Sequence, residues 1–196
     1  MEDVELNFNA RDGIEFEVYE GSEITLNNVE SKYNGWGVYS GGYGLFADTY
    51  YSPEDPFAPA KVILKGTNSF SGNKGEGFYM TYLFDVVVSR GATLNAYNNT
   101  LNGVTLYTNN ATEFPVSLTV ENGGAVNACG NGDEDNGAVD IRGGCDPCVG
   151  DRPGGSTNVF LPTSGKRYTC GSVAIDDVAN ANGFTCENTC PSCALS

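Results

Sequence analysis

The sequence predicts an all-β fold, a parallel β-helix with three strands per coil, and three observations lead to that prediction. Glycine is abundant, with 26 residues in 196, and 11% of the residues are aromatic, a composition typical of many short strands joined by tight turns. Segments of one pattern recur along the chain. Before each of them apolar residues alternate with polar ones, as in strands that bury one face.

The recurring segments share the pattern apolar-x-x-Gly-x-x-apolar, with Thr67 in place of the glycine in one of them. They begin at Val18, Leu64, Val88 and Val120. An asparagine follows each segment, at Asn27, Asn73, Asn98 and Asn131. A glycine with a short apolar run comes next, at Gly37, Gly77, Gly103 and Gly137. One repeat therefore holds three short strands and three turns, and the 24 positions from Leu64 to Val88 suit one such coil.

Stacked parallel coils account for this recurrence, because each residue then lies over its equivalent in the next coil. We expect about four to five coils, with insertions mainly at 38–60 and 108–115. The expected interior column is Ile24, Phe70, Leu94 and Val126. The expected outer rows are Glu15, Lys61 and Asp85, which alternate in charge, and Glu17, Ile63, Val87 and Thr119.

The insertion 38–60 is rich in aromatic residues and prolines. Ile63 and Val87 are apolar and are expected on the outside, so we predict that the insertion folds back over them. The alternative is that its rings form an exposed ligand site.

Phe70-Ser-Gly-Asn73, followed by Gly77-Phe78, resembles the FxxN and GGAI-type repeats of polymorphic outer-membrane autotransporter passengers. Residues 5–142 resemble right-handed parallel β-helix proteins of the pectate-lyase-like class, which implies a right-handed coil. Leu6–Asn9 looks like the last strand of a preceding coil. We therefore expect an uncapped N-terminal coil, whose strand edges would favour self-association.

Residues 1–142 are predicted to form the β-helix, and residues 143–196 a cysteine-rich, disulfide-stabilised segment that caps its C-terminal end. The chain has seven cysteines, Cys129, Cys145, Cys148, Cys170, Cys186, Cys190 and Cys193, and two glycosylation sequons, at Asn98 and Asn110. Together these features favour a secreted or cell-surface protein with at least two disulfides. Zinc held by the two CxxC motifs is the alternative.

The formal net charge of −15 argues against nucleic acid or an anionic membrane as a partner, and no apolar run approaches the ~20 residues of a membrane span. The acidic stretch 131–137 resembles the start of a calcium loop. Its candidate ligands are Asp133, Asp135 and Asp140, and a solvated turn is the alternative. The sequence suggests no cofactor other than calcium.

The chain has no histidine, which removes Ser-His-Asp, Cys-His and His-metal sites. The pectate-lyase-like resemblance implies a basic residue beside carboxylates that hold calcium. The candidate bases are Lys61, Lys65, Arg90 and Arg142. No predicted column collects several carboxylates around a base, so we expect no enzymatic activity.

The leading functional hypothesis is a non-catalytic extracellular protein with a structural, adhesive or surface-binding role and a polysaccharide or other cell-surface partner. The candidate binding face is a flat, polar outer surface formed by Thr25, Ser71, Thr93, Asn95 and Asn127. A polysaccharide lyase and an ice-binding protein are the alternatives, although the regular Thr-x-Thr rows of many ice-binding solenoids are absent.

Overall fold

The computed structural model of the protein is all-β, as predicted. It describes residues 1–37, 41–50, 58–107, 116–121, 123–132 and 141, and only the backbone of residues 142–144, 158–160, 167–170 and 173–175. These residues form sixteen strands in two sheets. Every strand pair among them is parallel, which confirms the predicted direction of pairing.

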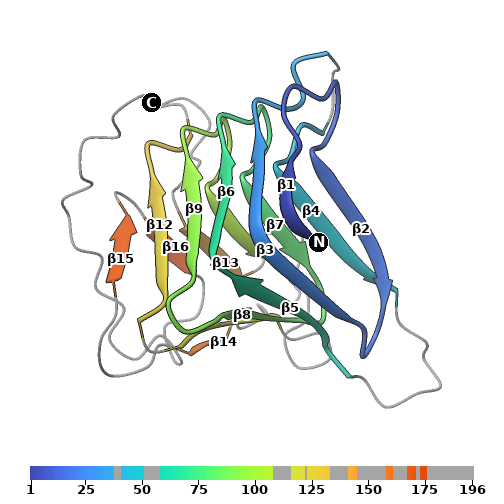
Figure 1. Ribbon diagram of the computed structural model, residues 1–196, viewed down its shortest axis with the longest axis vertical. Coiled ribbons are helices and arrows are strands. Elements are labelled where there is room, and N and C mark those ends of the chain that lie inside the picture. The colour runs from blue at the N-terminus through green and yellow to red at the C-terminus, as the bar shows by residue number, and fades with distance from the viewer. Residues whose placement is uncertain are drawn as a thin grey trace, which may run out of the picture.

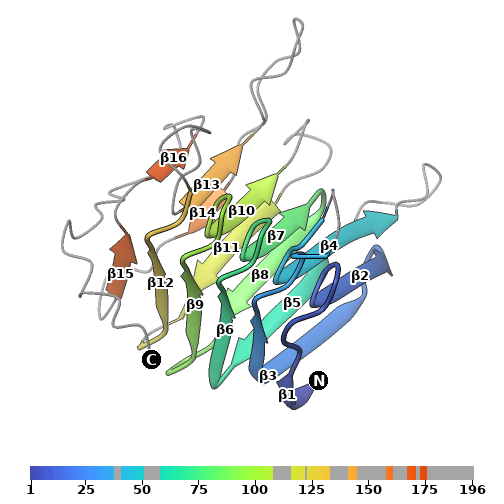
Figure 2. The ribbon, with the colours of Figure 1, turned by 90° about the horizontal axis from the view of Figure 1, so that it is seen from above.

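One sheet has six strands, which lie side by side in chain order (Figure 2). They are β2 (Ile14–Tyr19), β4 (Leu45–Tyr50), β7 (Phe78–Thr81), β10 (Val104–Tyr107), β13 (Ile141–Gly144) and β16 (Val173–Ile175). Parallel neighbours require the chain to leave the sheet and return between them, and the second sheet is built from the strands in between.

The second sheet has ten strands, and β3 (Glu23–Lys32) lies at its centre. The first half of β3 pairs with β5 (Ala60–Lys65), which continues the sheet through β8 (Phe84–Val88), β11 (Val116–Val120) and β14 (Asn158–Phe160). The second half pairs with β6 (Thr67–Ser71), followed by β9 (Thr93–Tyr97), β12 (Ala125–Cys129) and β15 (Arg167–Cys170) (Figure 1). The short strand β1 (Glu2–Glu5) also pairs with β3.

The two sheets nearly close around one apolar core, an arrangement consistent with a β-solenoid or barrel-like fold. Residues alternate between this core and the outside along several strands whose side chains are described; in β8, for example, Phe84, Val86 and Val88 are buried and the residues between them are half-buried. The core holds three fully buried phenylalanines, Phe70, Phe78 and Phe84. Burial of such large apolar side chains is the main stabilising term for a chain of this size.

Several predicted neighbours are confirmed. Leu64 pairs with Val88, and Val88 pairs with Val120. Leu94 pairs with Val126, and both side chains are fully buried. Ile63, Val87 and Thr119 also share one outer row and are half-buried.

The first of the four aligned segments is placed wrongly. Val18 lies in β2, in the other sheet, and the residue in register with Leu64 is Leu26. The cause is a turn that recurs at two different corners. Gly21 follows β2 and Gly91 follows β8, yet both have positive φ (70° and 73°) at the third position of a four-residue turn, where glycine is favoured.

Because the first segment is placed wrongly, the predicted members of the outer rows also differ from the observed ones. The observed pairs between β3 and β5 are Glu23 with Lys61, Ile24 with Val62 and Thr25 with Ile63. Glu15 and Glu17, which were predicted for these rows, lie in β2 of the other sheet. The predicted alternation of charge survives with a different member, because Lys61 lies between Glu23 and Asp85.

Phe70 is buried as predicted but does not share a row with Leu94, whose partner in β6 is Asn68. Gly66 alone joins β5 to β6, with φ of 60°, whereas residues 89–92 join β8 to β9. The shorter connection displaces β6 by two positions from the expected alignment. Ile24, the other predicted member of this column, is half-buried against the core.

The region 38–60, predicted as an insertion, contains strand β4. Leu45 of this strand pairs with Ile14 on one side and with Phe78 on the other. The glycine that precedes the strand is therefore Gly44 rather than Gly37. Residues 38–40 and 51–57 lie outside the described residues, so the predicted cover over Ile63 and Val87 stays a prediction, as does the structure of 108–115.

Buried asparagines form a ladder just beyond the ends of successive strands, β3, β6, β9 and β12. Asn34 donates from both its backbone N and its Nδ2 to Oδ1 of Asn73, at 3.0 and 2.9 Å. Asn73 donates in the same way to Asn99, at 3.0 Å for both atoms, and Asn99 to Asn131, at 3.0 and 2.9 Å. Asn9 begins this ladder with two donors to Asn34. Asn73 and Asn131 were predicted correctly, whereas Asn34 and Asn99 take the places predicted for Asn27 and Asn98.

The residue before each ladder asparagine lies in the left-handed region of the backbone. The five residues are Phe8, Tyr33, Gly72, Asn98 and Gly130, with φ of 59°, 56°, 67°, 54° and 65°. Backbone hydrogen bonds link this column to the neighbouring strands; for example, Phe8 N donates to Lys32 O at 3.0 Å and Tyr33 N to Ser71 O at 3.1 Å. Glycine and asparagine tolerate this conformation, whereas aromatic residues rarely adopt it.

The burial of Leu94 leads to a direct prediction. We expect Leu94→Ala to lower the free energy of unfolding by about 3 kcal/mol, because the fully buried side chain would leave a cavity between Asn68 and Val126. Denaturant unfolding measures this change. Ser69→Ala, on the half-buried outer side of β6, is the control and should change stability by less than about 0.5 kcal/mol. A loss at Leu94 as small as the loss at Ser69 would contradict its place in the core.

Candidate binding surfaces

The predicted binding face is divided between the two halves of the ten-stranded sheet. Ser71, Thr93, Asn95 and Asn127 lie on the outer side of β6, β9 and β12, all half-buried, and Asn127 Nδ2 donates to Asn95 Oδ1 at 2.9 Å. Thr25 lies beside Ile63, in the half of β3 that pairs with β5. The face is thus narrower than predicted, and whether it binds a ligand stays a prediction.

The basic residues considered for lyase chemistry do not share a site. Lys61 and Lys65 lie in β5, and Arg90 lies in the turn after β8, where its backbone N donates to Glu121 Oε2 at 2.8 Å. Only the backbone of Arg142 is described. Among the described residues, no group of three or more histidine, cysteine, aspartate or glutamate side chains is arranged to hold a metal ion.

Several predicted sites lie outside the described residues. They are Asp133, Asp135 and Asp140 of the calcium hypothesis, the sequon at Asn110, and six of the seven cysteines, of which Cys170 is described only in its backbone. Cys129 ends β12 and is buried. Asn98 of the other sequon is exposed, at a left-handed corner. No helix among the described residues has the length and apolar character needed to cross a membrane.

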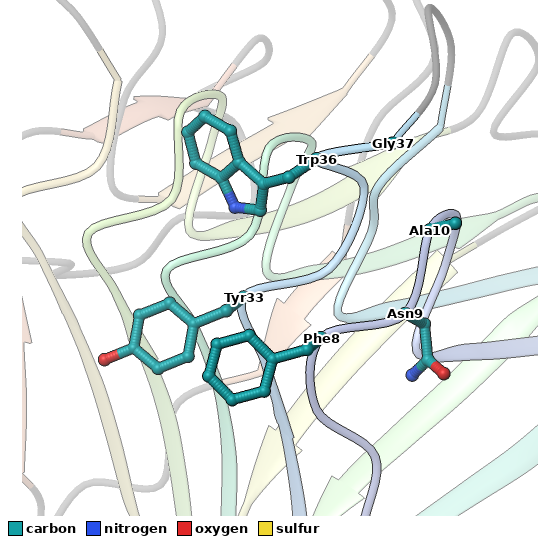
Figure 3. A pocket seen from close by; sticks show the side chains of 6 residues that line it. All are labelled: Phe8, Asn9, Ala10, Tyr33, Trp36 and Gly37. Atoms are coloured by element: carbon teal, nitrogen blue, oxygen red, sulfur yellow. The ribbon is translucent and has the colours of Figure 1, made fainter.

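A surface hollow that the sequence did not predict lies beside Phe8 and Tyr33, two of the residues with left-handed backbone that precede the ladder asparagines. It has a volume of about 580 Å³ and is lined by Phe8, Asn9, Ala10, Tyr33, Trp36 and Gly37 (Figure 3). The rings of Phe8 and Tyr33 stack 5.2 Å apart with an angle of 16° between their planes. Phe8, Tyr33 and Trp36 remain 77%, 43% and 66% exposed, although large aromatic side chains are usually covered.

Two close approaches shape this hollow. A β-carbon at Gly72 would lie 2.6 Å from Tyr33 Cε1, so the ring of Tyr33 covers a position that only glycine can occupy. Gly37 lies against Ala10, because a β-carbon at Gly37 would be 3.0 Å from the Ala10 side chain. The Asn9 amide is turned away from the rings and donates to Asn34 Oδ1. The ring of Tyr33 therefore packs directly on the backbone at Gly72, and the Asn9 side chain contributes to the asparagine ladder rather than to the hollow.

A second aromatic cluster lies on the outer side of β4, β7 and β10. The rings of Tyr43 and Phe46 stack with their centroids 5.3 Å apart. The ring of Tyr79 contacts both, with centroid distances of 5.4 Å to Tyr43 and 5.5 Å to Phe46. Tyr107 continues the row, 6.5 Å from Tyr79 and 5.6 Å from Tyr82. These rings cover one another and form a continuous surface along the stacking direction.

Two tyrosines of this cluster, Tyr43 and Tyr79, have raised pKa values. Burial, followed by the negative charges of Glu76 and Asp12, raises the pKa of Tyr43 to about 12. Burial and Glu76 also raise the pKa of Tyr79. Both side chains therefore stay neutral over the physiological range and present hydroxyl groups rather than phenolates.

The chain matches no protein-family model, and comparisons with curated proteins and with solved structures find no significant match. The resemblance to pectate-lyase-like proteins therefore stays an expectation, and the function is argued from the surfaces themselves.

Proposed function

We propose that the chain is a non-catalytic, extracellular surface-binding β-solenoid and that the hollow lined by Phe8, Tyr33 and Trp36 binds sugar rings of a neutral polysaccharide. The proposed scaffold is a right-handed parallel β-helix with three strands per coil and a disulfide-stabilised cap at 143–196. The regular pairing of β5, β8 and β11, and of β6, β9 and β12, supports this scaffold.

The observation that carries the binding proposal is the pair of aromatic residues at left-handed φ. Phe8 and Tyr33 occupy a column whose other members are Gly72, Asn98 and Gly130. Placing a side chain other than glycine or asparagine there costs roughly 1–2 kcal/mol per residue. Backbone strain of this kind is concentrated at functional sites, and here it exposes two stacked rings beside Trp36.

The chemistry of the hollow favours a sugar ring. The apolar faces of pyranose rings pack on aromatic faces, and Tyr33 Oη and Trp36 Nε1 add groups that can bond to hydroxyls. A neutral glycan is favoured over a polyuronate because the chain carries a net charge of −15, which repels polyanions.

We expect Trp36→Ala to weaken binding to a neutral polysaccharide about three- to tenfold, the effect of losing one aromatic contact of about 0.5–1.5 kcal/mol. Affinity electrophoresis against a panel of soluble neutral glycans measures this change. Trp36 is largely exposed, so its replacement should leave the melting temperature nearly unchanged. Phe8→Ala should act in the same direction.

Tyr19→Ala is the matched control, because Tyr19 is 75% exposed but lies on β2, outside the hollow. The proposal is overturned if no neutral glycan binds, or if Trp36→Ala retains full binding to the glycan that does. Equal losses at Tyr19 and Trp36 would place the sugar site elsewhere.

A further inference from the structure

A surface separate from the hollow combines carboxylates with aromatic rings, some of them exposed and some half-buried. It consists of the outward side chains of β2 and β4, which we call the acid–aromatic face: Glu15, Glu17, Tyr19, Phe46, Asp48 and Tyr50. The intervening residues of both strands face the core. Register places Glu15 beside Phe46, Glu17 beside Asp48 and Tyr19 beside Tyr50.

The charges on this face are unbalanced. Glu17 and Asp48 are in register on neighbouring parallel strands, about 4.8 Å apart in backbone spacing, where like charges destabilise a sheet. In the other sheet, an outer row that contains two carboxylates also contains a basic residue, since Lys61 lies between Glu23 and Asp85. No lysine or arginine belongs to the acid–aromatic face, so its own side chains do not balance the carboxylates.

Neutral hydrogen-bond donors hold these carboxylates in place. Asp48 Oδ1 accepts from Thr81 Oγ1 at 2.7 Å and from the Thr49 backbone N at 2.8 Å. The charge of Glu17 and its hydrogen bond to the Tyr50 hydroxyl raise the pKa of Tyr50, and Asp48 adds to this effect. Both carboxylates are thus oriented by hydrogen bonds from neutral groups.

The rings beside them suit a cation as well. Tyr19 and Tyr50 are 75% and 53% exposed, with ring centroids 6.2 Å apart. A lysine or arginine side chain near such rings gains a cation–π interaction, and the adjacent carboxylates add an ion pair. Along one strand Glu15 and Glu17 are two positions apart, about 6.7 Å, which is also the spacing of alternate side chains in an extended peptide.

We propose that the acid–aromatic face docks an extended polypeptide segment of a partner protein that carries lysine or arginine at alternate positions. Its basic side chains lie against Glu15, Glu17 and Asp48, and their alkyl stems pack on Tyr19, Tyr50 and Phe46. The inference is independent of the sugar-binding hollow, because it uses none of the residues that line it.

The experiment uses the full chain and a short fluorescent peptide of alternating Lys and Ala, with binding followed by anisotropy at low and moderate salt. Glu17→Gln and Asp48→Asn, which remove charge but preserve shape, should each weaken binding about two- to fivefold, and the double variant about tenfold. Tyr50→Leu should weaken it by a similar two- to fivefold factor. Raising the salt concentration should weaken binding by the native chain more than binding by the double variant.

Four controls accompany this experiment. Glu23→Gln removes the same charge from the balanced row and should leave affinity unchanged, and melting curves establish that every variant is folded. Trp36→Ala should also leave peptide binding intact, so the peptide proposal can be tested even if the sugar proposal fails. A peptide of the same composition with its lysines in one block should bind several-fold more weakly.

Absence of peptide binding, or full binding by the folded Glu17→Gln/Asp48→Asn variant, overturns the proposal. If Glu23→Gln lost as much peptide affinity as Glu17→Gln, the effect would come from net charge alone, and the proposal would be overturned too. Equal affinity for the block peptide would overturn the extended geometry. If an amine-bearing polysaccharide binds through Glu17 and Asp48 and the peptide does not, the partner is not a polypeptide.

Discussion

Asn73→Leu should lower the free energy of unfolding by about 4 kcal/mol. Leucine has the same number and branching of side-chain heavy atoms as asparagine, but it removes the Oδ1 acceptor used by both the backbone N and Nδ2 of Asn34. Asn34 and Asn73 are fully buried, so these donors lose a partner where water cannot replace it. Each such orphaned group costs about 1–3 kcal/mol, and Ser31 O also loses the donor at 3.3 Å. Urea unfolding followed by circular dichroism measures the change.

Asn127→Leu is the matched control for this substitution. Asn127 also bonds to another asparagine, with Nδ2 2.9 Å from Asn95 Oδ1, but it is half-buried on the outer side of β12. Water can replace its partner, so we expect a loss below about 1 kcal/mol. Similar losses at Asn73 and Asn127 would mean that the ladder contributes no more than a surface hydrogen bond.

Gly77→Ala should destabilise the protein by about 4 kcal/mol or more, although alanine is the smallest possible addition. A β-carbon at this position would lie 2.5 Å from Asn99 Nδ2 and 2.7 Å from the carbonyl oxygens of Gly103 and Phe70. Two of these three neighbours are backbone atoms in the packed stack, so the clash adds overpacking to the loss of a ladder hydrogen bond. Thermal unfolding and the yield of folded protein are the measurements.

Gly91→Ala is the control that distinguishes the cost of the steric clash at Gly77 from the cost of placing alanine in a left-handed backbone conformation. Gly91 has φ of 73°, but no atom lies within 4 Å of the position of its β-carbon. The substitution should therefore cost only the roughly 1–2 kcal/mol of a left-handed alanine. If Gly91→Ala were the more damaging of the two, close approach at Gly77 would not be the reason for its glycine.

The comparison of β8 with β11 shows where sequence alignment predicts register well. Four residues separate β8 from β9, and four separate β11 from β12, so one alignment places both Val88 with Val120 and Leu94 with Val126 correctly. The alignment fails at Gly66, where a one-residue connection reaches β6. Turn lengths are set by local backbone geometry, which the alternation of apolar residues does not reveal.

The hollow could have been found in the sequence only after the ladder was known. Ladder asparagines precede a glycine by four positions in Asn9–Gly13, Asn73–Gly77 and Asn99–Gly103. Once those asparagines are aligned, the preceding residues are seen to be mostly glycine or asparagine. Phe8 and Tyr33 then stand out as aromatic residues at a position that favours left-handed backbone. The sequence pattern does not predict the acid–aromatic face for another reason, because the alignment of the repeats places Glu15 and Glu17 in the wrong sheet.

The hydrogen bonds of the asparagine ladder all run in one direction, from Asn9 through Asn34, Asn73 and Asn99 to Asn131. The amide dipoles are therefore aligned head to tail, and each one polarises the next. A level in the middle of the stack is held by neighbours on both sides, whereas the outermost level is held by one. Opening of the structure should begin at the ends and advance one level at a time, and folding should proceed as growth on levels already formed.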